Sequence, residues 1–234
     1  MGENMEQTRF SNAGFKESLY EKRLQLSLIL TGVIWVSGLI GHFTPAGEWP
    51  ALFIYVLGGI GIVLWHGKNT GEWKEMFIST ENLGKSLKWG GIIGGFLFVM
   101  DVANTYMYLK GGGEPMAQME EILVGMNMLY LFPLLILAEE FLWRGILFSA
   151  LLEKGLNKHL VVAITTILYM VNHFAVAPVG LFERGLMAMM AMPIGIIGGY
   201  LVANTRNLWG SALIHTTTMV SMILDIFLIP KLVS

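Results

Sequence analysis

The sequence predicts an all-α fold, a polytopic bundle of about seven to eight transmembrane helices. Hydrophobic residues make up 54% of the 234 residues and charged residues only 14%, whereas soluble domains carry about 25% charged residues. The mean hydropathy is +0.61. Apolar stretches approach the ~20 residues that a spanning helix needs, and they cover residues 24–41, 51–66, 87–109, 122–152, 159–177, 185–203 and 208–229.

The stretch 122–152 is longer than a single span requires. At 1.5 Å per residue it would extend about 46 Å, whereas the hydrocarbon core is about 30 Å thick. We therefore expect this stretch to tilt, to kink at Pro133 or to divide in two. The expected organisation is a polar tail over residues 1–23, with a possible interfacial helix, and one transmembrane domain over residues 24–234 with its motif core at 122–219.

The distribution of basic residues predicts the orientation in the membrane. Most of the 15 Lys and Arg residues fall in the tail and in alternate loops, and Lys and Arg accumulate on the cytoplasmic side. We therefore expect a multi-pass protein of the cell membrane with a cytoplasmic N-terminus and the lipid bilayer as its surroundings. No small-residue cleavage site follows the first apolar stretch, so we read that stretch as a retained anchor.

Charge and composition exclude several classes of function. The net charge is −2, which provides no basic surface for nucleic acid. The chain has no cysteine, so thiolate nucleophiles, disulfides and iron–sulfur ligation are excluded. The sequence also lacks HExxH, GxGD and GxSG motifs, which excludes the zinc, aspartyl and rhomboid types of intramembrane protease.

Three charged residues lie inside the otherwise apolar stretch 122–152, namely Glu139, Glu140 and Arg144. Each costs about 2.5–3.5 kcal/mol at the centre of a spanning helix, so they must face a protein interior or a hydrated cavity. At 100° per residue, Glu140 and Arg144 are about 40° apart and one turn distant, and we expect them to pair. Glu139 is about 140° from Arg144, which leaves it available as a general base.

Two histidines also lie within apolar stretches. Glu139 and His173 are both predicted roughly 20 Å from the inner membrane face, so they can meet across neighbouring antiparallel helices. His215 follows the start of its stretch at Leu208 by about 10 Å. Its helix must therefore begin deeper in the protein, or tilt, for His215 to join the other two.

These residues resemble the motifs of the CPBP family, the CAAX proteases and bacteriocin-processing enzymes also called Abi, which are glutamate-type intramembrane proteases. The EExxxR motif is matched from Glu139 to Arg144. The FxxxH motif is matched from Tyr169 to His173, with tyrosine in place of phenylalanine. In the HxxxN or HxxxD motif His215 matches, but Met219 stands at the position of the amide or acid.

The resemblance implies a metal-independent peptidase, without a cofactor, that cleaves a membrane-associated or prenylated peptide. In such an enzyme Glu139 activates water, His173 helps to orient it and His215 helps to stabilise the tetrahedral oxyanion. The supporting residues implied are Glu140, Arg144 and Tyr169.

Met219 departs from the family pattern in a way that matters chemically, because a thioether has no proton to donate. Ser211 and Thr218 lie at i−4 and i+3 from His215, on the same helical face. We predict that one of these hydroxyls substitutes for the missing oxyanion donor.

Three other functions remain compatible with the same residues. A catalytically impaired immunity or scaffold protein of the same family is favoured by Met219. A proton-coupled transporter would use Glu139 and His173 as a relay. Two carboxylates and two histidines could also hold a divalent metal ion. The sequence identifies neither the substrate nor the oligomeric state.

Overall fold

The structure is a computed structural model. It describes the backbone of residues 2–115 and 117–233, and the side chains of residues 19–115, 117 and 119–233. Most of the tail predicted over residues 1–23 therefore lies outside the described side chains, and its interfacial placement stays a prediction. The described part of the chain is a helical bundle, as the composition predicts.

Within the described residues, six helices are long and apolar enough to cross a membrane, as judged from length and composition. They correspond to six of the seven predicted stretches. They are α1 (Gly2–His42, counted from Leu19), α2 (Trp49–Thr70), α3 (Leu83–Lys110), α7 (Lys158–Val176), α8 (Leu181–Thr205) and α9 (Trp209–Phe227).

The seventh stretch, 122–152, is divided, and its pieces are individually too short to count as spans. A short helical segment comes first, formed by α4 (Ala117–Glu120) and η1 (Glu121–Gly125), and a longer run follows, formed by α5 (Met128–Glu139), η2 (Glu140–Leu147) and α6 (Phe148–Glu153). The division falls at Asn127, which has a φ of 56°. Pro133 lies within α5 and does not end it.

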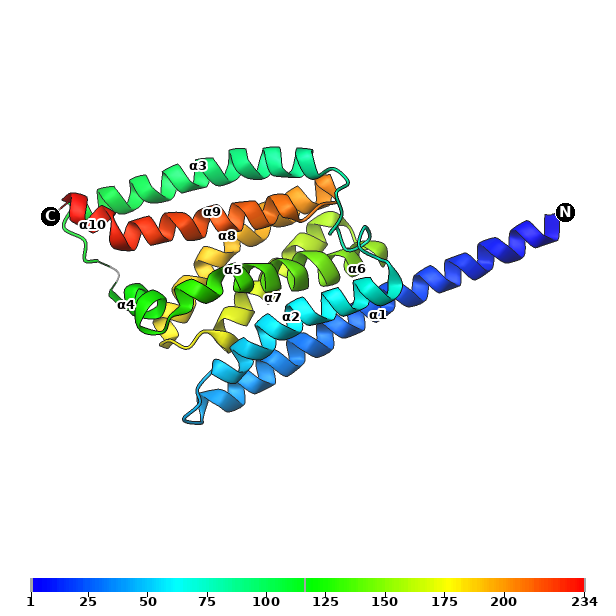
Figure 1. Cartoon of the computed structure of the whole chain (residues 1–234), viewed down its shortest axis with the longest axis horizontal. Coiled ribbons are helices and arrows are strands. Elements are labelled where there is room, and N and C mark those ends of the chain that lie inside the picture. The colour runs from blue at the N-terminus through cyan, green and yellow to red at the C-terminus, as the bar shows by residue number, and fades with distance from the viewer. Residues whose placement is uncertain (1, 116, 234) are drawn as a thin grey trace.

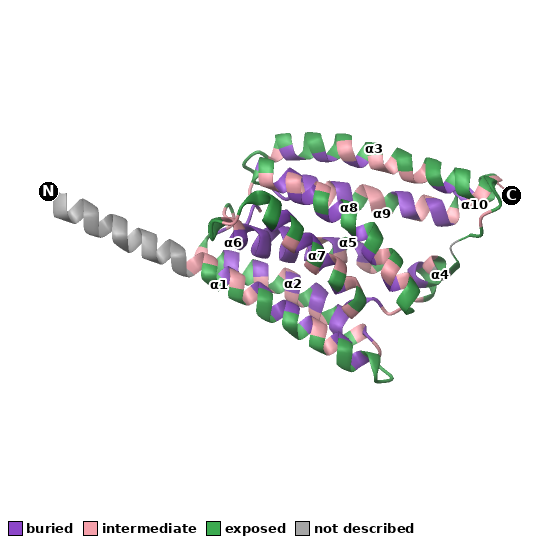
Figure 2. Cartoon of the chain, turned by 180° about the vertical axis from the view of Figure 1, so that it is seen from behind, coloured by how far each residue is buried: buried purple, intermediate pink, exposed green. Residues whose placement is uncertain are grey.

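The long helices form an outer pair on each side of a central group (Figure 1). α3 and α9 lie side by side along one edge, next to the short helix α10 (Ile229–Val233), and α1 and α2 form a hairpin along the other. α5, α7 and α8 lie between these pairs. All eight residues of η2 are buried, so the segment that carries Glu140 and Arg144 is at the centre of the protein, where buried positions are concentrated (Figure 2).

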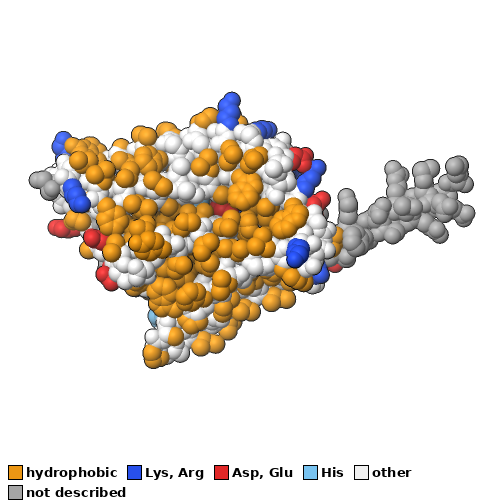
Figure 3. All heavy atoms as spheres, viewed as in Figure 1, with side chains coloured by type: hydrophobic (Ala, Val, Ile, Leu, Met, Phe, Trp, Pro, Cys, Tyr) orange, Lys and Arg blue, Asp and Glu red, His pale blue; other side chains and the backbone are white. Residues whose placement is uncertain are grey.

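The outer surface has the character of a membrane protein. Many large apolar side chains are exposed, including Phe96 on α3, Leu57 on α2 and Phe182 on α8. Figure 3 shows hydrophobic side chains covering the middle of one face, with Lys and Arg near its ends. On α3 only Ser86, Gly90, Gly94 and Thr105 are buried, so one narrow side of this helix faces the protein.

Small residues bring α3 and α9 together. A Cβ atom on Gly90 would lie 2.7 Å from the Cα atom of Gly210, a distance that only glycine permits. Ser86 seals the same crossing, because its hydroxyl accepts a hydrogen bond of 2.9 Å from the Gly210 amide and donates one of 3.1 Å to the Asn207 carbonyl. Close backbone approach of this kind is typical of membrane helix pairs.

A buried network of charged residues joins α1, α2 and α6 at one end of the bundle. The guanidinium of Arg23, which is fully buried, donates to the hydroxyl of Ser149 at 2.6 Å and pairs with Glu72 at 3.4 Å and with Glu153. Glu72 also contacts His66, with 2.6 Å between Oε2 and Nε2. These contacts fix the end of the run that begins at α5.

Candidate active site

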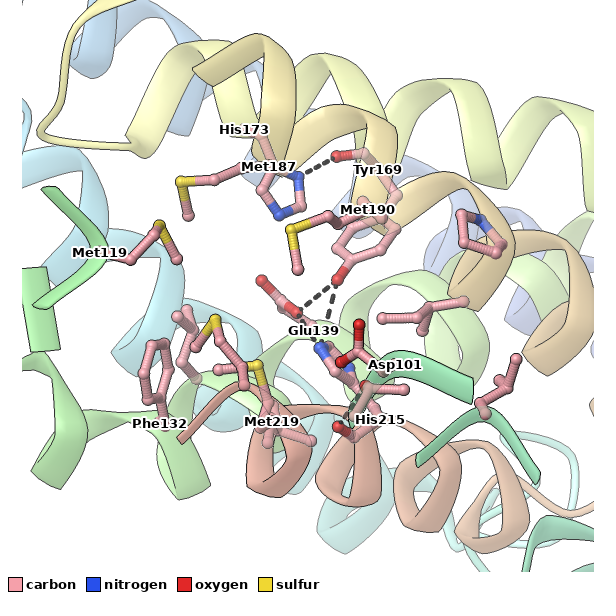
Figure 4. A pocket seen from close by; sticks show the side chains of 18 of the residues that line it. Asp101, Met119, Phe132, Glu139, Tyr169, His173, Met187, Met190, His215 and Met219 are labelled. Atoms are coloured by element: carbon pink, nitrogen blue, oxygen red, sulfur yellow. Dashed lines mark hydrogen bonds and ion pairs between the residues drawn. The ribbon is translucent and has the colours of Figure 1, made fainter. Parts of the chain in front are cut away.

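A cavity of about 390 Å³ lies between α3, α5, α7, α8 and α9. Its polar lining includes Glu139, Tyr169, His173 and His215 (Figure 4). The rest of the lining is mainly apolar and rich in methionine, with Met100, Met119, Met187, Met190, Met219 and Met222. The high methionine content of the chain, 16 of 234 residues, is the only sequence signal for this lining. Flexible thioether side chains suit a surface that adapts to irregular apolar groups.

The two glutamates of the EExxxR motif face different surroundings. Glu139 is the last residue of α5 and lines the cavity, with 5% of its surface exposed. Glu140 is the first residue of the π-helix η2 and is fully buried. Its Oε1 lies 3.7 Å from Nη1 of Arg144, as expected from the i,i+4 spacing. π-helical turns are frequent at functional sites, and this one begins directly after the carboxylate of interest.

Tyr169 and His215 are the direct neighbours of Glu139. The hydroxyl of Tyr169 donates a hydrogen bond of 2.8 Å to Oε2 of Glu139 and lies 3.4 Å from Nε2 of His215. Nε2 of His215 is also 3.4 Å from Oε2 of Glu139, and its Nδ1 is 3.4 Å from Oε1 of Glu140. The imidazole of His215 therefore lies between the two carboxylates.

His215 reaches the site because α9 begins inside the protein. Asn207 and Leu208 are fully buried. The Leu208 amide donates to the Phe77 carbonyl at 3.0 Å, and the Asn207 side chain donates to the Ser79 and Glu81 carbonyls at 2.8 and 2.9 Å. The loop before α9 therefore packs against residues 77–81, and the helix begins inside the protein, which is one of the two conditions expected for His215 to join the site.

His173 lines the same cavity from α7, but it is not a hydrogen-bond partner of Glu139 among the described contacts. Its Nδ1 lies 2.9 Å from the Tyr169 carbonyl. A carbonyl can only accept, so Nδ1 carries the proton and the neutral ring presents Nε2 as an acceptor. In Figure 4 the ring projects toward the carboxylate of Glu139. The two side chains line the same cavity.

The remaining predicted residues have distinct places. Met219 lines the cavity, so the position of the family's amide presents a thioether there. Thr218 also lines it, but its hydroxyl donates to the His215 carbonyl at 2.8 Å. Ser211 is fully buried and is not among the cavity-lining residues.

Tyr169 lies closer to the centre of the site than a supporting residue needs to. The resemblance implies a supporting role for this residue, and in the structure its hydroxyl contacts both Glu139 and His215. The signal was present in the motif, because tyrosine in place of phenylalanine adds a buried hydroxyl that needs a partner.

The described residues include no group of three or more His, Cys, Asp or Glu side chains that could hold a metal ion. Glu139, His173 and His215 are grouped around the ring of Tyr169 at the cavity. This arrangement suits proton transfer and hydrogen-bond donation.

The fold and the cavity define a polytopic helical membrane protein with a buried carboxylate, tyrosine and histidine cluster inside the bundle. Residues 121–220 match the Rce1-like family model, described as type II CAAX prenyl endopeptidase Rce1-like. The matched segment includes the positions of all three motifs and confirms the resemblance to the CAAX protease family. No curated protein and no solved structure matches the chain.

Proposed function

We propose that this protein is a CAAX-type intramembrane peptidase in which Glu139 activates water to hydrolyse a peptide bond. The observation that carries the proposal is the burial of Glu139 on the wall of an apolar cavity, beside Tyr169 and His215 and facing His173. An ionisable group within a membrane-spanning bundle costs free energy. A carboxylate that lines a cavity can act on a molecule bound there.

The geometry supports a division of roles. A water molecule between Glu139 and His173 would donate one hydrogen bond to Nε2 of His173 and one proton to Glu139 as its oxygen attacks the carbonyl carbon. His215, with Nε2 at the cavity, would donate to the oxygen on which negative charge develops. Glu139 would then return its proton to the leaving amine.

Glu140 and Arg144 act on this centre through His215. Glu140 contacts the far nitrogen of the imidazole, Nδ1, and accepts its hydrogen. Donation from Nε2 to the oxyanion therefore requires the doubly protonated ring. Arg144 balances the charge of Glu140. A carboxylate behind a histidine fixes the orientation of the ring, as in other hydrolytic sites.

The cavity lining points to the class of substrate. Its apolar, methionine-rich walls suit an apolar chain attached to a peptide, and the exposed apolar surface places the protein in a bilayer. We propose a membrane-associated or prenylated peptide as substrate, a metal-independent reaction without a cofactor, and a location in the cell membrane with the N-terminus in the cytoplasm.

The test is a cleavage assay with the purified full-length protein in detergent. The probes are a quenched-fluorescent peptide that ends in a farnesylated CAAX sequence and its unprenylated counterpart. We expect cleavage by the wild type and loss of at least a hundredfold in Glu139→Ala and His173→Ala. Glu114→Gln, a change at an exposed carboxylate, is the matched control and should cleave normally. Equal cleavage by Glu139→Ala would contradict the proposal.

Met219 favours a second candidate, a catalytically impaired member that binds a membrane peptide without cleaving it. That reading predicts binding of the farnesylated peptide by the wild type with no product. A transporter would instead show proton flux into liposomes that disappears in Glu139→Gln. Cleavage that depends on Glu139 excludes both alternatives as the principal function.

A further inference from the structure

We propose that Tyr169 is a catalytic residue of this peptidase, and that its hydroxyl supplies the oxyanion hydrogen bond that Met219 cannot give. The inference rests on the proposed function. It names the side chain that donates a hydrogen bond to the oxyanion in place of the amide that is missing at position 219. It concerns two positions at which this chain departs from the family motifs, one that gains a hydroxyl and one that loses an amide.

The first step is the position of the hydroxyl. Tyr169 has 1% of its surface exposed, and its oxygen lies 2.8 Å from Oε2 of Glu139 and 3.4 Å from Nε2 of His215. Figure 4 shows it between these two groups on the cavity side. It is therefore next to the proposed base and next to the proposed oxyanion donor.

The second step is the fixed orientation of the ring. The guanidinium carbon of Arg144 lies 4.7 Å from the ring centroid of Tyr169. The ring of His173 packs edge-on at 4.9 Å between centroids and that of His215 at 6.2 Å. Contacts on several sides hold the ring, so the hydroxyl hydrogen is the main part of the side chain that can reorient. A preorganised donor of this kind costs little to redirect during a reaction.

The third step concerns the residues that the sequence offers as oxyanion donors next to His215. Thr218 donates to a backbone carbonyl, and Ser211 does not line the cavity. Met219 lines the cavity but has no proton to donate. Among the described side chains that line the cavity, Tyr169 and His215 are the two donors that the structure places at Glu139.

The fourth step is the movement of negative charge during the reaction. In the resting site the phenol donates to the Glu139 carboxylate. As the water oxygen bonds to the carbonyl carbon, the water proton passes to Glu139 and the π-electron pair moves to the carbonyl oxygen. Negative charge leaves Glu139 and develops on that oxygen, so the phenol hydrogen turns from the first to the second. When the C–N bond breaks, the amine takes the proton from Glu139 and the phenol returns to the carboxylate. Tyr169 keeps its own proton throughout, as phenol donors do in other oxyanion sites.

The principal test is Tyr169→Phe, assayed with the farnesylated CAAX reporter peptide. We expect kcat to fall roughly 10²- to 10³-fold, the loss typical for removal of one oxyanion donor, while KM changes little. Tyr200→Phe is the matched control, because it removes a tyrosine hydroxyl that contacts His159 at 2.8 Å away from the cavity. Its kcat should stay within twofold of the wild type.

A second variant tests the link to position 219. Adding Met219→Asn to Tyr169→Phe recreates the family pattern at both positions, and we expect kcat to recover at least tenfold relative to Tyr169→Phe. The same Met219→Asn change should give a smaller gain in the wild-type background, where the phenol already donates. A double variant no faster than Tyr169→Phe would overturn the assignment.

Inhibitor binding separates a catalytic role from a structural one. A phosphinic analogue of the reporter peptide carries a tetrahedral centre with a negative oxygen. Tyr169→Phe should weaken its binding by the same factor as kcat/KM and leave binding of the product peptide unchanged. Equal weakening of both ligands, or of neither, would overturn the proposal. If the wild type cleaves the peptide and Glu139→Ala does not, these failures concern Tyr169 alone, whereas an inactive wild type refutes the proposed function.

Discussion

Oε1 of Glu140 lies 3.4 Å from Nδ1 of His215, and the same oxygen is 3.7 Å from Nη1 of Arg144. All three side chains are buried. The second glutamate of the motif is therefore a link between a buried cation and the imidazole at the cavity. The ion pair can therefore affect both the stability of the fold and the proposed reaction, and different substitutions distinguish the two effects.

Removal of Arg144 alone should destabilise the protein, because it leaves Glu140 as an uncompensated buried charge. For Arg144→Met we expect a loss of about 3 kcal/mol, the lower end of the range for a broken buried pair. That corresponds to a fall in Tm of about 6–12 °C for a chain of this size. The measurement is thermal unfolding in detergent, followed by tryptophan fluorescence.

The double change Glu140→Leu with Arg144→Met should recover most of this stability, since replacement of both charges removes the desolvation cost. Peptide cleavage should remain at least tenfold below wild type, because His215 has lost the carboxylate behind it. A double variant that regains full activity would show that Glu140 has no role beyond pairing with Arg144.

Cleavage should persist without metal ions. The predicted mechanism uses a carboxylate and donors rather than a Lewis acid, and the described side chains offer no cluster suited to a metal. We expect the wild type, after dialysis against EDTA and with 1,10-phenanthroline present, to retain cleavage of the farnesylated reporter within twofold. Inhibition that added Zn²⁺ reverses would instead establish a metal-dependent enzyme.

Hydropathy predicted the helical bundle because lipid imposes a simple length and composition rule on each span. It did not predict where the stretch 122–152 divides. Pro133 is the obvious helix breaker, yet the chain turns at Asn127, where a positive φ is tolerated by asparagine. The π-helix after Glu139 carries no composition signal, so the sequence did not predict the change of helix type at Glu140.

In the site, contacts between residues close in the sequence could be predicted, whereas contacts between distant residues could not. The pair of Glu140 and Arg144 follows from i,i+4 spacing and could be predicted. The depth of His215 depends on hydrogen bonds from Asn207 and Leu208 to residues more than 120 positions away. Arg23 contributed to the predicted orientation as a tail cation, but it is fully buried against partners far along the chain. Single-sequence patterns carry no information on such contacts.

The crossing of α3 and α9 should tolerate no side chain at Gly210. An added Cβ atom would contact the backbone carbonyl and the hydroxyl of Ser86 and would lie 2.8 Å from its carbonyl carbon. Gly210→Ala should therefore cost about 1–3 kcal/mol through overpacking and reduce cleavage, since α9 carries His215. Gly95→Ala on α3 is the control, because a Cβ atom there meets nothing within 4 Å. Equal stability of the two variants, measured by thermal unfolding, would argue against a close crossing.

Because Glu48 pairs with Arg184, the stability of the folded protein should fall in acid. Burial works against ionisation of Glu48, but hydrogen bonds from Arg184 and His42 outweigh it and lower the pKa of this carboxyl below its usual 4.5. A carboxyl with a lowered folded-state pKa contributes stability that is fully present above its unfolded pKa and is lost as the pH falls through the folded value. The wild type should therefore lose stability below about pH 4.5.

The matching variant is Glu48→Gln, which should have a lower Tm than wild type at pH 7 and a smaller further fall in acid. Tm measured in detergent from pH 7 to pH 3 gives the comparison, with Glu114→Gln as the exposed control. If the Tm difference between wild type and Glu48→Gln is the same at pH 3 and pH 7, then Glu48 is not the group responsible.

The absence of cysteine from the chain permits a direct test of the predicted orientation. Thr80, in the loop between α2 and α3, is predicted to face the cytoplasm, and Glu114, between α3 and α4, to face the outside; both are exposed. In intact cells a membrane-impermeant maleimide should label Glu114→Cys but not Thr80→Cys, and permeabilisation should make both react. The positive-inside rule motivates this expectation, because Lys68, Lys74, Lys85 and Lys88 flank Thr80. The reverse labelling pattern would place the N-terminus outside, and the end of the bundle that holds Arg23, Glu72 and Glu153 would then face away from the cytoplasm.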